Sequence, residues 1–313
     1  MAKKELIYGC MGLGGGWNTN SLSSDDFKQA ENAVEAALEV GITYFDHADI
    51  YTNGKAELVF GQLLKAKPSL RDKIILQSKA GIRHHEGLMN SSIYDLSKKY
   101  LLQQVDIILK RLQTDYLDVF MLHRPDPLLN PEEIADTFRI LKKEGKVKRF
   151  GVSNMTLHQI DFIQKHCDDQ LAVNQIELSL KHSLLIDAGI LANRVHTPDF
   201  NGVEGLLEYT QSNNLAIQAY SPLMGGRFSG NDLLASKEDK ITIDLVSQLA
   251  EKYNTTASAI LLAWVIKIPG NIQPIIGTTN PKRIAECKDA VTIDLSRLDW
   301  YNLWITARGE KIP

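Results

Sequence analysis

Short apolar stretches rich in β-branched residues alternate with longer amphipathic stretches along almost the whole chain. This alternation is typical of repeated strand–helix units around a parallel β-sheet. The candidate strands are residues 6–10, 43–46, 74–79, 117–122, 147–152, 172–175, 216–219 and 274–276. Eight strands are enough to close such a sheet, so we predict an α/β fold, a (β/α)8 TIM barrel that forms a single domain over residues 1–313.

Helix start signals precede three of the amphipathic stretches. Ser24-Asp25-Asp26 precedes a predicted helix at residues 27–40, Asn130-Pro131 starts a second, and Asn280-Pro281 starts a third at residues 282–290. Stretches without helical or strand periodicity are predicted to be long loops, at residues 83–92, 188–203 and 223–239. In a barrel of this kind the loops that follow strands form the active site, so such insertions fit the fold.

A glycine cluster follows the first predicted strand, where a dinucleotide-binding loop of an open α/β sheet would lie. The segment Gly12-Leu13-Gly14-Gly15-Gly16-Trp17 places Trp17 where the last glycine of that motif packs helix against strand. We therefore interpret the cluster as a flexible loop at the mouth of the barrel.

Charge and cysteine content exclude several classes of partner. Lys and Arg total 35 against 38 Asp and Glu, a net charge of -3, so we expect no nucleic-acid partner. The N-terminus lacks the apolar stretch of a signal peptide and the purest apolar run, residues 259–266, is too short for a bilayer, so we predict a cytoplasmic protein without a membrane partner. Cys10, Cys167 and Cys287 are far apart and form no Cys-x-x-Cys pair, so we expect reduced thiols and no metal.

Four polar residues lie at or just beyond the carboxyl ends of consecutive predicted strands: Asp46, Tyr51, Lys79 and His123. In a parallel barrel these ends open on one face, so the four side chains can converge. Taken alone, each residue also has an ordinary structural explanation: a loop carboxylate, a rim aromatic, an exposed strand-end lysine and a core histidine. Their joint placement favours a catalytic site.

The chemistry of the four residues suggests proton transfer. A lysine ammonium about 4 Å from a tyrosine hydroxyl would favour the phenolate by roughly three pK units before desolvation is subtracted. Such a shift would bring Tyr51 into range for general acid catalysis. Asp46 would pair with the Lys79 ammonium, and His123 would orient the carbonyl oxygen that Tyr51 protonates.

The residues around this set resemble the aldo-keto reductase family. The resemblance begins with Gly41-Ile-Thr-Tyr-Phe-Asp46-His-Ala48-Asp-Ile-Tyr51, then Leu-Gln-Ser-Lys79 and Met-Leu-His123. It continues through Gly151-Val-Ser-Asn154, Val173-Asn-Gln175, Ala219-Tyr-Ser-Pro-Leu223 and Ile276-Gly-Thr-Thr279 to Arg283-Ile-Ala-Glu286. The motifs agree in order and in strand placement from roughly residue 6 to 290.

This resemblance implies a (β/α)8 barrel, a nicotinamide cofactor and reversible hydride transfer to a small-molecule aldehyde or ketone. By position, Asp46, Tyr51, Lys79 and His123 correspond to the family's catalytic tetrad, with Tyr51 as proton donor. Ser153, Asn154 and Gln175 correspond to residues that bind the nicotinamide carboxamide, and Tyr220 to the aromatic that stacks on its ring.

The resemblance also implies contacts to the rest of the cofactor. Ser221, Leu223 and Arg227 fall where the pyrophosphate would pass, although a turn built on Pro222 and Gly225-Gly226 explains them equally well. Thr278, Thr279 and Arg283, at the start of the predicted last helix, suit a 2′-phosphate and favour NADPH over NADH, which is still possible. Many family members have Lys at Gly277 and Asn at Cys287, so this chain departs from the pattern there.

Trp17, Arg124 and Met155 are the candidates for the substrate rim, because each lies in a loop after a predicted strand. Trp17 could also pack on the barrel as a lid, and Arg124 could simply pair with Asp126. The sequence does not identify the substrate or the oligomeric state.

Two other functions are compatible with parts of the sequence. Tyr51 to Lys55 and Tyr94 to Lys98 have the Tyr-x-x-x-Lys spacing of short-chain dehydrogenases, but Gly54 breaks the first pair and the second follows too few strand–helix units. A redox sensor or regulatory subunit that binds NADP(H) with little turnover would keep the same tetrad. Turnover on a substrate panel separates this alternative from an enzyme.

Overall fold

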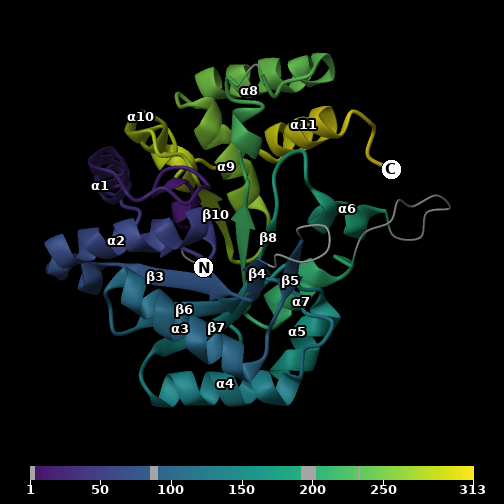
Figure 1. The fold of residues 1–313 in the computed structure, drawn as a ribbon. Helices are drawn as coiled ribbons and strands as arrows, with labels where there is room; N and C mark the ends of the chain where they lie inside the picture. The colour runs from purple at the N-terminus through teal and green to yellow at the C-terminus, as the bar shows by residue number, and fades with distance from the viewer. Residues whose placement is uncertain (1–3, 85–90, 192–201, 232) are drawn as a thin grey trace. The chain divides into compact units, whose positions relative to one another are not determined.

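Eight parallel strands form a closed barrel, in the spatial order β1-β10-β9-β8-β7-β6-β3-β2, in this computed structural model. The prediction of a (β/α)8 barrel is confirmed (Figure 1). The structure describes residues 4–84, 91–191, 202–231 and 233–313. The barrel strands are β1 (Ile7–Gly9), β2 (Tyr44–Asp46), β3 (Ile75–Ala80), β6 (Leu117–Leu122), β7 (Val147–Ser153), β8 (Val173–Glu177), β9 (Ala216–Tyr220) and β10 (Ile272–Ile276).

The helices between and after the strands are mostly amphipathic and bury one face. They are α1 (Ser24–Glu39), α2 (Lys55–Ala66), α3 (Lys98–Leu112), α4 (Pro131–Lys143), α5 (Leu157–Gln164), α6 (Leu184–Ile190), α7 (Leu206–Ser212), α8 (Lys240–Lys252), α9 (Ala257–Lys267), α10 (Pro281–Ala285) and α11 (Arg297–Arg308). In the described part of the chain, no helix combines the length and the apolar character that crossing a bilayer requires. The cytoplasmic location stays a prediction.

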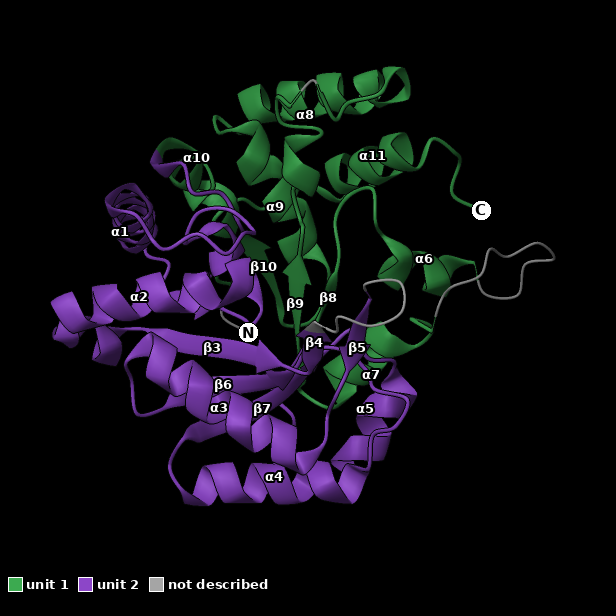
Figure 2. Ribbon diagram, viewed as in Figure 1, with its two compact units in different colours: residues 1–6, 175–276, 282–313 green, residues 7–174, 277–281 purple. Residues whose placement is uncertain are grey.

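The chain divides into two compact units, coloured separately in Figure 2. Unit 2 comprises residues 7–174 and 277–281, and unit 1 comprises residues 1–6, 175–276 and 282–313. The single domain stays a prediction. Unit 2 holds β1, β2, β3, β6 and β7 with α1 to α5, and its strands pair in parallel register, for example Asp46 with Gln77 and Lys79 with Met121.

Local sequence signals explain where the predicted helices begin. Ser23 caps α1 by accepting the N–H of Asp26, whose carboxylate accepts the N–H of Ser23 in return, so the helix begins three residues earlier than predicted. Asn130 caps α4 by accepting the N–H groups of Glu132 and Glu133, and Pro131 takes the first helical position. These caps satisfy backbone donors that a helix start leaves without partners.

The third predicted helix, at residues 282–290, is much shorter in the structure. α10 ends at Ala285, and a separate 3₁₀ turn follows at Lys288–Val291. The hydroxyl of Thr256 donates to the carbonyl of Glu286 at 2.6 Å, a carbonyl that a continuing α-helix would pair with residue 290. Ala290 instead donates to Cys287, which tightens the chain into the 3₁₀ turn. α10 is also not the last helix, because α11 follows it.

All three loop predictions also need correction. Part of the predicted loop at residues 83–92 forms a small antiparallel pair, β4 (Ile82–His84) with β5 (Ser92–Tyr94), and residues 85–90 lie outside the described part. α6 begins before the predicted loop at residues 188–203 and extends into it, while residues 192–201 are not described. The predicted loop at residues 223–239, of which residue 232 is not described, contains two short 3₁₀ turns, Met224–Gly226 and Lys237–Asp239.

Part of the glycine cluster after β1 packs closely against α2, and the flexibility of the loop stays a prediction. Gly14 has φ +78°, and a Cβ there would lie 2.7 Å from the backbone of Lys55 at the start of α2. Only glycine allows this approach, because a side chain would meet backbone in a conformation that L residues rarely adopt. The segment therefore fits closely against the region that follows β2.

Candidate active site

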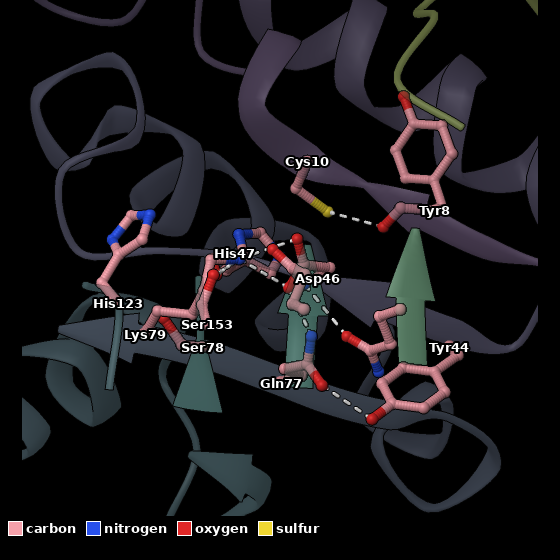
Figure 3. A network of polar contacts seen from close by, with 12 residues as sticks. Tyr8, Cys10, Tyr44, Asp46, His47, Gln77, Ser78, Lys79, His123 and Ser153 are labelled. Carbon is pink, nitrogen blue, oxygen red and sulfur yellow. Dashed lines mark hydrogen bonds and ion pairs between the residues drawn. The ribbon is translucent and has the colours of Figure 1, made fainter. Parts of the chain in front are cut away.

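The carboxyl ends of neighbouring strands in unit 2 hold most of the predicted catalytic residues. Asp46 is the last residue of β2, Lys79 is the next to last of β3, and His123 directly follows β6. Tyr51 begins a 3₁₀ turn, Tyr51–Gly54, between β2 and α2. Figure 3 shows Asp46, Lys79 and His123 at this end of the strands, with Ser153 from the end of β7 nearby. Unit 2 thus brings the four candidates together.

Lys79 and Asp46 form a buried ion pair. The Lys79 side chain is fully buried, and its Nζ donates to Asp46 Oδ1 at 2.7 Å, to Oδ2 at 2.8 Å and to the carbonyl of His47 at 2.8 Å. Asp46 also accepts from the amide of Gln77, whose own oxygen accepts the hydroxyl of Tyr44 at 2.7 Å. Burial opposes the Lys79 charge, but Asp46 and Tyr51 outweigh it and the pKa of Lys79 is raised. The ammonium therefore persists at neutral pH.

Tyr51 lies against this ammonium. Lys79 Nζ is 4.9 Å from the centroid of the Tyr51 ring. Burial raises the pKa of Tyr51 to about 12, although Lys79 acts in the opposite direction. The expectation that Lys79 brings this pKa below its usual value is therefore wrong. The physical reason is that Asp46 neutralises much of the Lys79 charge, while the low-dielectric surroundings disfavour a phenolate.

His123 also lies next to Tyr51 and is neutral. The two ring centroids are 6.2 Å apart, with an angle of 81° between the ring planes. Burial, together with the charges of Lys79 and Arg124, holds the pKa of His123 well below its usual value. Its Nδ1 is buried without a hydrogen-bond partner among the described residues. A neutral imidazole can donate one N–H to a carbonyl oxygen without carrying charge into the site.

Ser153 and Asn154 extend the site from the end of β7. Ser153 is 1% exposed, and its Oγ accepts from the Asn154 amide at 2.8 Å. The same amide lies 3.5 Å from the carbonyl oxygen of His123. Asn154 has φ +57°, so the chain turns sharply where β7 ends. Hydroxyl and amide groups beside His123 form a donor set that suits a carboxamide.

The remaining predicted cofactor residues are distributed over both units. In unit 2, Tyr8 donates to the carbonyl of Thr278, and Thr279 lies next to Gly12. The others lie in unit 1 on or after β8, β9 and β10: Gln175, Tyr220, Ser221, Leu223, Arg227 and Arg283. Gln175 donates to Gln218 at 3.0 Å, and Arg227 is paired with Asp239 at 2.7 Å. Their cofactor roles stay predictions.

The three predicted substrate residues differ in exposure. Trp17 is 52% exposed and Arg124 is half-buried, as a rim position requires. Met155 is only 2% exposed, and its backbone is held by the side-chain amide of Asn174, so it occupies a core position rather than a rim. The alternative explanation of Arg124 was a pair with Asp126. The Asp126 carboxylate accepts the backbone N–H groups of Leu96 and Leu128.

Sequence reasoning missed several buried polar groups next to the tetrad. His47 is fully buried against Phe60, with both ring nitrogens lacking partners among the described residues, and burial lowers its pKa to about 3. Glu57, on the buried face of α2, accepts from Ser78 at 2.7 Å and pairs with Arg111 at 3.2 Å. Glu57 could have been noticed in the sequence, because it is a charged residue among the apolar residues of a helix. Charged residues are rarely buried unless they are paired.

Comparison with known proteins gives the same result as the geometry. The model of the aldo/keto reductase family matches residues 5–303. The chain belongs to the aldo/keto reductase family. Members of this family are NAD(P)H-dependent oxidoreductases, so the prediction of that enzyme class is confirmed.

Individual relatives of this aldo/keto reductase match it over nearly its full length. It is 33% identical over 301 residues to the uncharacterized oxidoreductase YcsN of Bacillus subtilis, covering 95% of this chain and 94% of that protein. It is 32% identical over 311 residues to a 6-dehydroglucose reductase of Agrobacterium fabrum, covering 98% and 95%. An aldo-keto reductase of Klebsiella pneumoniae, solved in complex with NADPH, superposes with a TM-score of 0.74 at 25% identity, covering 98% and 96%.

Proposed function

We propose that this protein reduces an aldehyde or ketone to an alcohol with NADPH, and that Tyr51 is the general acid. The observation that carries the proposal is the contact of Tyr51 with a buried, charged Lys79 and a neutral His123. A tyrosine whose pKa burial raises to about 12 keeps its proton at neutral pH, as a proton donor must. The same ammonium stabilises the phenolate that remains after the proton has left.

The other tetrad residues position and stabilise these groups. Asp46 holds Lys79 by two hydrogen bonds, so the ammonium stays in a place from which water is excluded. His123 is the residue that would orient the substrate carbonyl oxygen, since its uncharged ring can donate an N–H toward the Tyr51 hydroxyl region. Arg124 and Trp17 are proposed to contact the substrate beyond the carbonyl.

NADPH would supply the hydride when bound, and this chain offers groups of suitable chemistry for it. The Ser153 hydroxyl and Asn154 amide at the end of β7 suit the nicotinamide carboxamide, with Gln175 proposed as a third donor and Tyr220 as the stacking aromatic. Ser221, Leu223, Thr278 and Thr279 are proposed for the phosphates. Arg227 would have to leave Asp239 or share it to contact the pyrophosphate.

The proposal is tested by NADPH oxidation with wild type and Tyr51→Phe. The panel contains methylglyoxal, a sugar aldehyde and an aromatic aldehyde, each run with NADPH and with NADH. Tyr51→Phe should lower the rate by about 10²–10⁴-fold, while NADPH affinity, measured by fluorescence titration, changes less than about twofold. An unimpaired variant would contradict the assignment of Tyr51. NADPH binding without turnover on any substrate would favour the sensor or regulatory subunit.

Arg283 is proposed to contact the 2′-phosphate of NADPH. A guanidinium recognises phosphate by paired hydrogen bonds, and NADH lacks this phosphate. The proposal rests on the Arg283 side chain rather than on a helix terminus, since α10 has only five residues. Arg283→Ala should weaken NADPH binding by about tenfold or more and leave NADH binding nearly unchanged. Equal losses for the two cofactors would contradict this contact.

A further inference from the structure

We propose that Arg111 is a positioning residue that holds Tyr51 in place by binding the chain on both sides of it. Arg111 Nη1 donates to the carbonyl oxygen of Asp49 at 2.9 Å, two residues before Tyr51. Its guanidinium also lies against Gly54, three residues after Tyr51, where a Cβ would come within 2.5 Å of the guanidinium carbon. The proposal rests on the role of Tyr51 proposed above.

The segment between these two contacts has a conformation that needs support. Thr52 and Asn53 have φ values of +47° and +60°, and Gly54 follows with +83°. A β-branched residue such as Thr rarely adopts a positive φ, and such a conformation persists only where its surroundings impose it. The Thr52 hydroxyl donates to the carbonyl of Leu13 at 2.9 Å, which holds one side of the turn.

The other side of the turn borders a cavity rather than a packed core. Asp49, Ile50, Asn53 and Arg111 are among the residues that line this cavity of about 610 Å³. Packed side chains therefore do not hold this side of the segment, and Arg111 reaches it from the last turn of α3. An arginine suits this place because its planar group donates several hydrogen bonds and packs flat against a glycine.

Glu57 orients Arg111 and connects it to Lys79. The Glu57 side chain is fully buried; its Oε2 accepts from Arg111 Nη1 at 3.2 Å and its Oε1 accepts from Ser78 Oγ at 2.7 Å. Ser78 directly precedes Lys79 in β3. The backbone N–H of Asp49 donates to the carbonyl of Lys79 at 2.9 Å, so the same group of bonds holds the strand that carries the ammonium and the turn that carries the phenol.

The test compares Arg111→Met with Arg71→Met, a matched control from the same unit. Arg71 also pairs with a buried carboxylate, Asp118, at 2.9 Å, but it lies at the amino ends of β3 and β6. With the fastest substrate of the panel above, Arg111→Met should lower kcat by about 10–100-fold, because small displacements of a catalytic group have effects of this size. NADPH affinity should change less than about twofold. Arg71→Met should retain kcat, measured per folded molecule well below its melting temperature.

A double variant separates positioning from general destabilisation. If Arg111 acts through Tyr51, then Arg111→Met in the Tyr51→Phe background should lower the residual rate by less than about twofold. An equal loss in both backgrounds, an unchanged kcat for Arg111→Met, or an equal kcat loss for Arg71→Met would each overturn the proposal. If Arg111→Met does not fold, Arg111→Lys is measured by the same criteria. Lysine keeps the positive charge, but its side chain is shorter.

The outcomes also distinguish this proposal from the proposed function. Loss of activity in Tyr51→Phe together with full activity in Arg111→Met overturns only the positioning role. Full activity in Tyr51→Phe, or no turnover of any panel substrate by the wild type, overturns the proposed function, and the positioning role is overturned with it.

Discussion

The two ends of the parallel strands in unit 2 both hold a cation paired with a buried carboxylate, but the surroundings of the two pairs differ. At the amino ends, Asp118 accepts from Arg71 at 2.9 Å, from Lys148 at 3.0 Å and from the backbone N–H of Leu76 at 3.0 Å. Burial alone would raise the pKa of Asp118, but these donors hold it below its usual value. All three donors therefore stabilise the buried Asp118 carboxylate.

At the carboxyl ends, buried polar groups are left without partners. Six buried side-chain atoms in the described residues have no hydrogen bond, and four of them belong to His47, Asp49 and His123. Burial, with Glu57 nearby, raises the pKa of Asp49 to about 8. Buried groups without partners are costly, so their concentration at one end indicates where stability is lowered for function. The amino end thus holds a fully paired carboxylate, and the carboxyl end is where we propose that the chemistry takes place.

The largest expected effect comes from breaking the pair at the carboxyl end. Lys79→Met should abolish measurable carbonyl reduction, and it should lower the free energy of unfolding by about 3–5 kcal/mol because Asp46 stays charged and buried. Adding Asp46→Asn removes that charge and should recover part of the stability but none of the activity. Denaturant unfolding and NADPH oxidation measure the two effects. Unchanged stability in the single variant would show that the ion pair is not buried as described.

A smaller effect is expected from breaking the pair at the amino end. Arg71→Met should lower the free energy of unfolding by about 1–3 kcal/mol, because Asp118 keeps Lys148 and the Leu76 N–H as partners. Activity per folded molecule should be unchanged. Denaturant unfolding followed by kinetics on the folded protein measures both. A large loss of kcat would contradict the division of roles between the two ends.

The last expected effect depends on pH and concerns Asp49. Its folded pKa of about 8 lies above the usual value of 3.8, so the folded state binds one more proton than the unfolded state between these pH values. Stability from this group is therefore complete below about pH 4 and falls as pH rises toward 8. Asp49→Asn does not titrate, so its melting temperature should exceed that of the wild type at pH 8.

The pH series has an internal control. His47 and His123 are buried and neutral in both proteins, so their protonation in acid lowers both melting temperatures and largely cancels in the difference. The difference between Asp49→Asn and wild type should shrink toward zero near pH 4. A difference that stays constant over the whole range would show that Asp49 does not titrate as described.

Most strands of the barrel could be predicted from the sequence, because a buried strand is a short run of apolar residues. The strand at 117–122 matches β6 at both ends, and most others differ by one or two residues. Helix lengths were predicted less well where tertiary contacts end a helix, as the Thr256 hydroxyl does at Glu286. The placement of Asp46, Lys79 and His123 at strand ends was predictable, because each residue lies at or just after the end of an apolar run in the sequence.

The sequence by itself determined the order of strands and helices and the end of each strand at which the reactive residues lie, because both depend on local periodicity and chain direction. Only the tertiary structure decided the protonation of Tyr51 and the contacts that hold it, because desolvation depends on what surrounds a group. Arg111 reaches Asp49 across 62 positions of the chain, and no local pattern relates the two residues. The balance between the Lys79 charge and burial, which sets the pKa of Tyr51, likewise exists only in the folded protein.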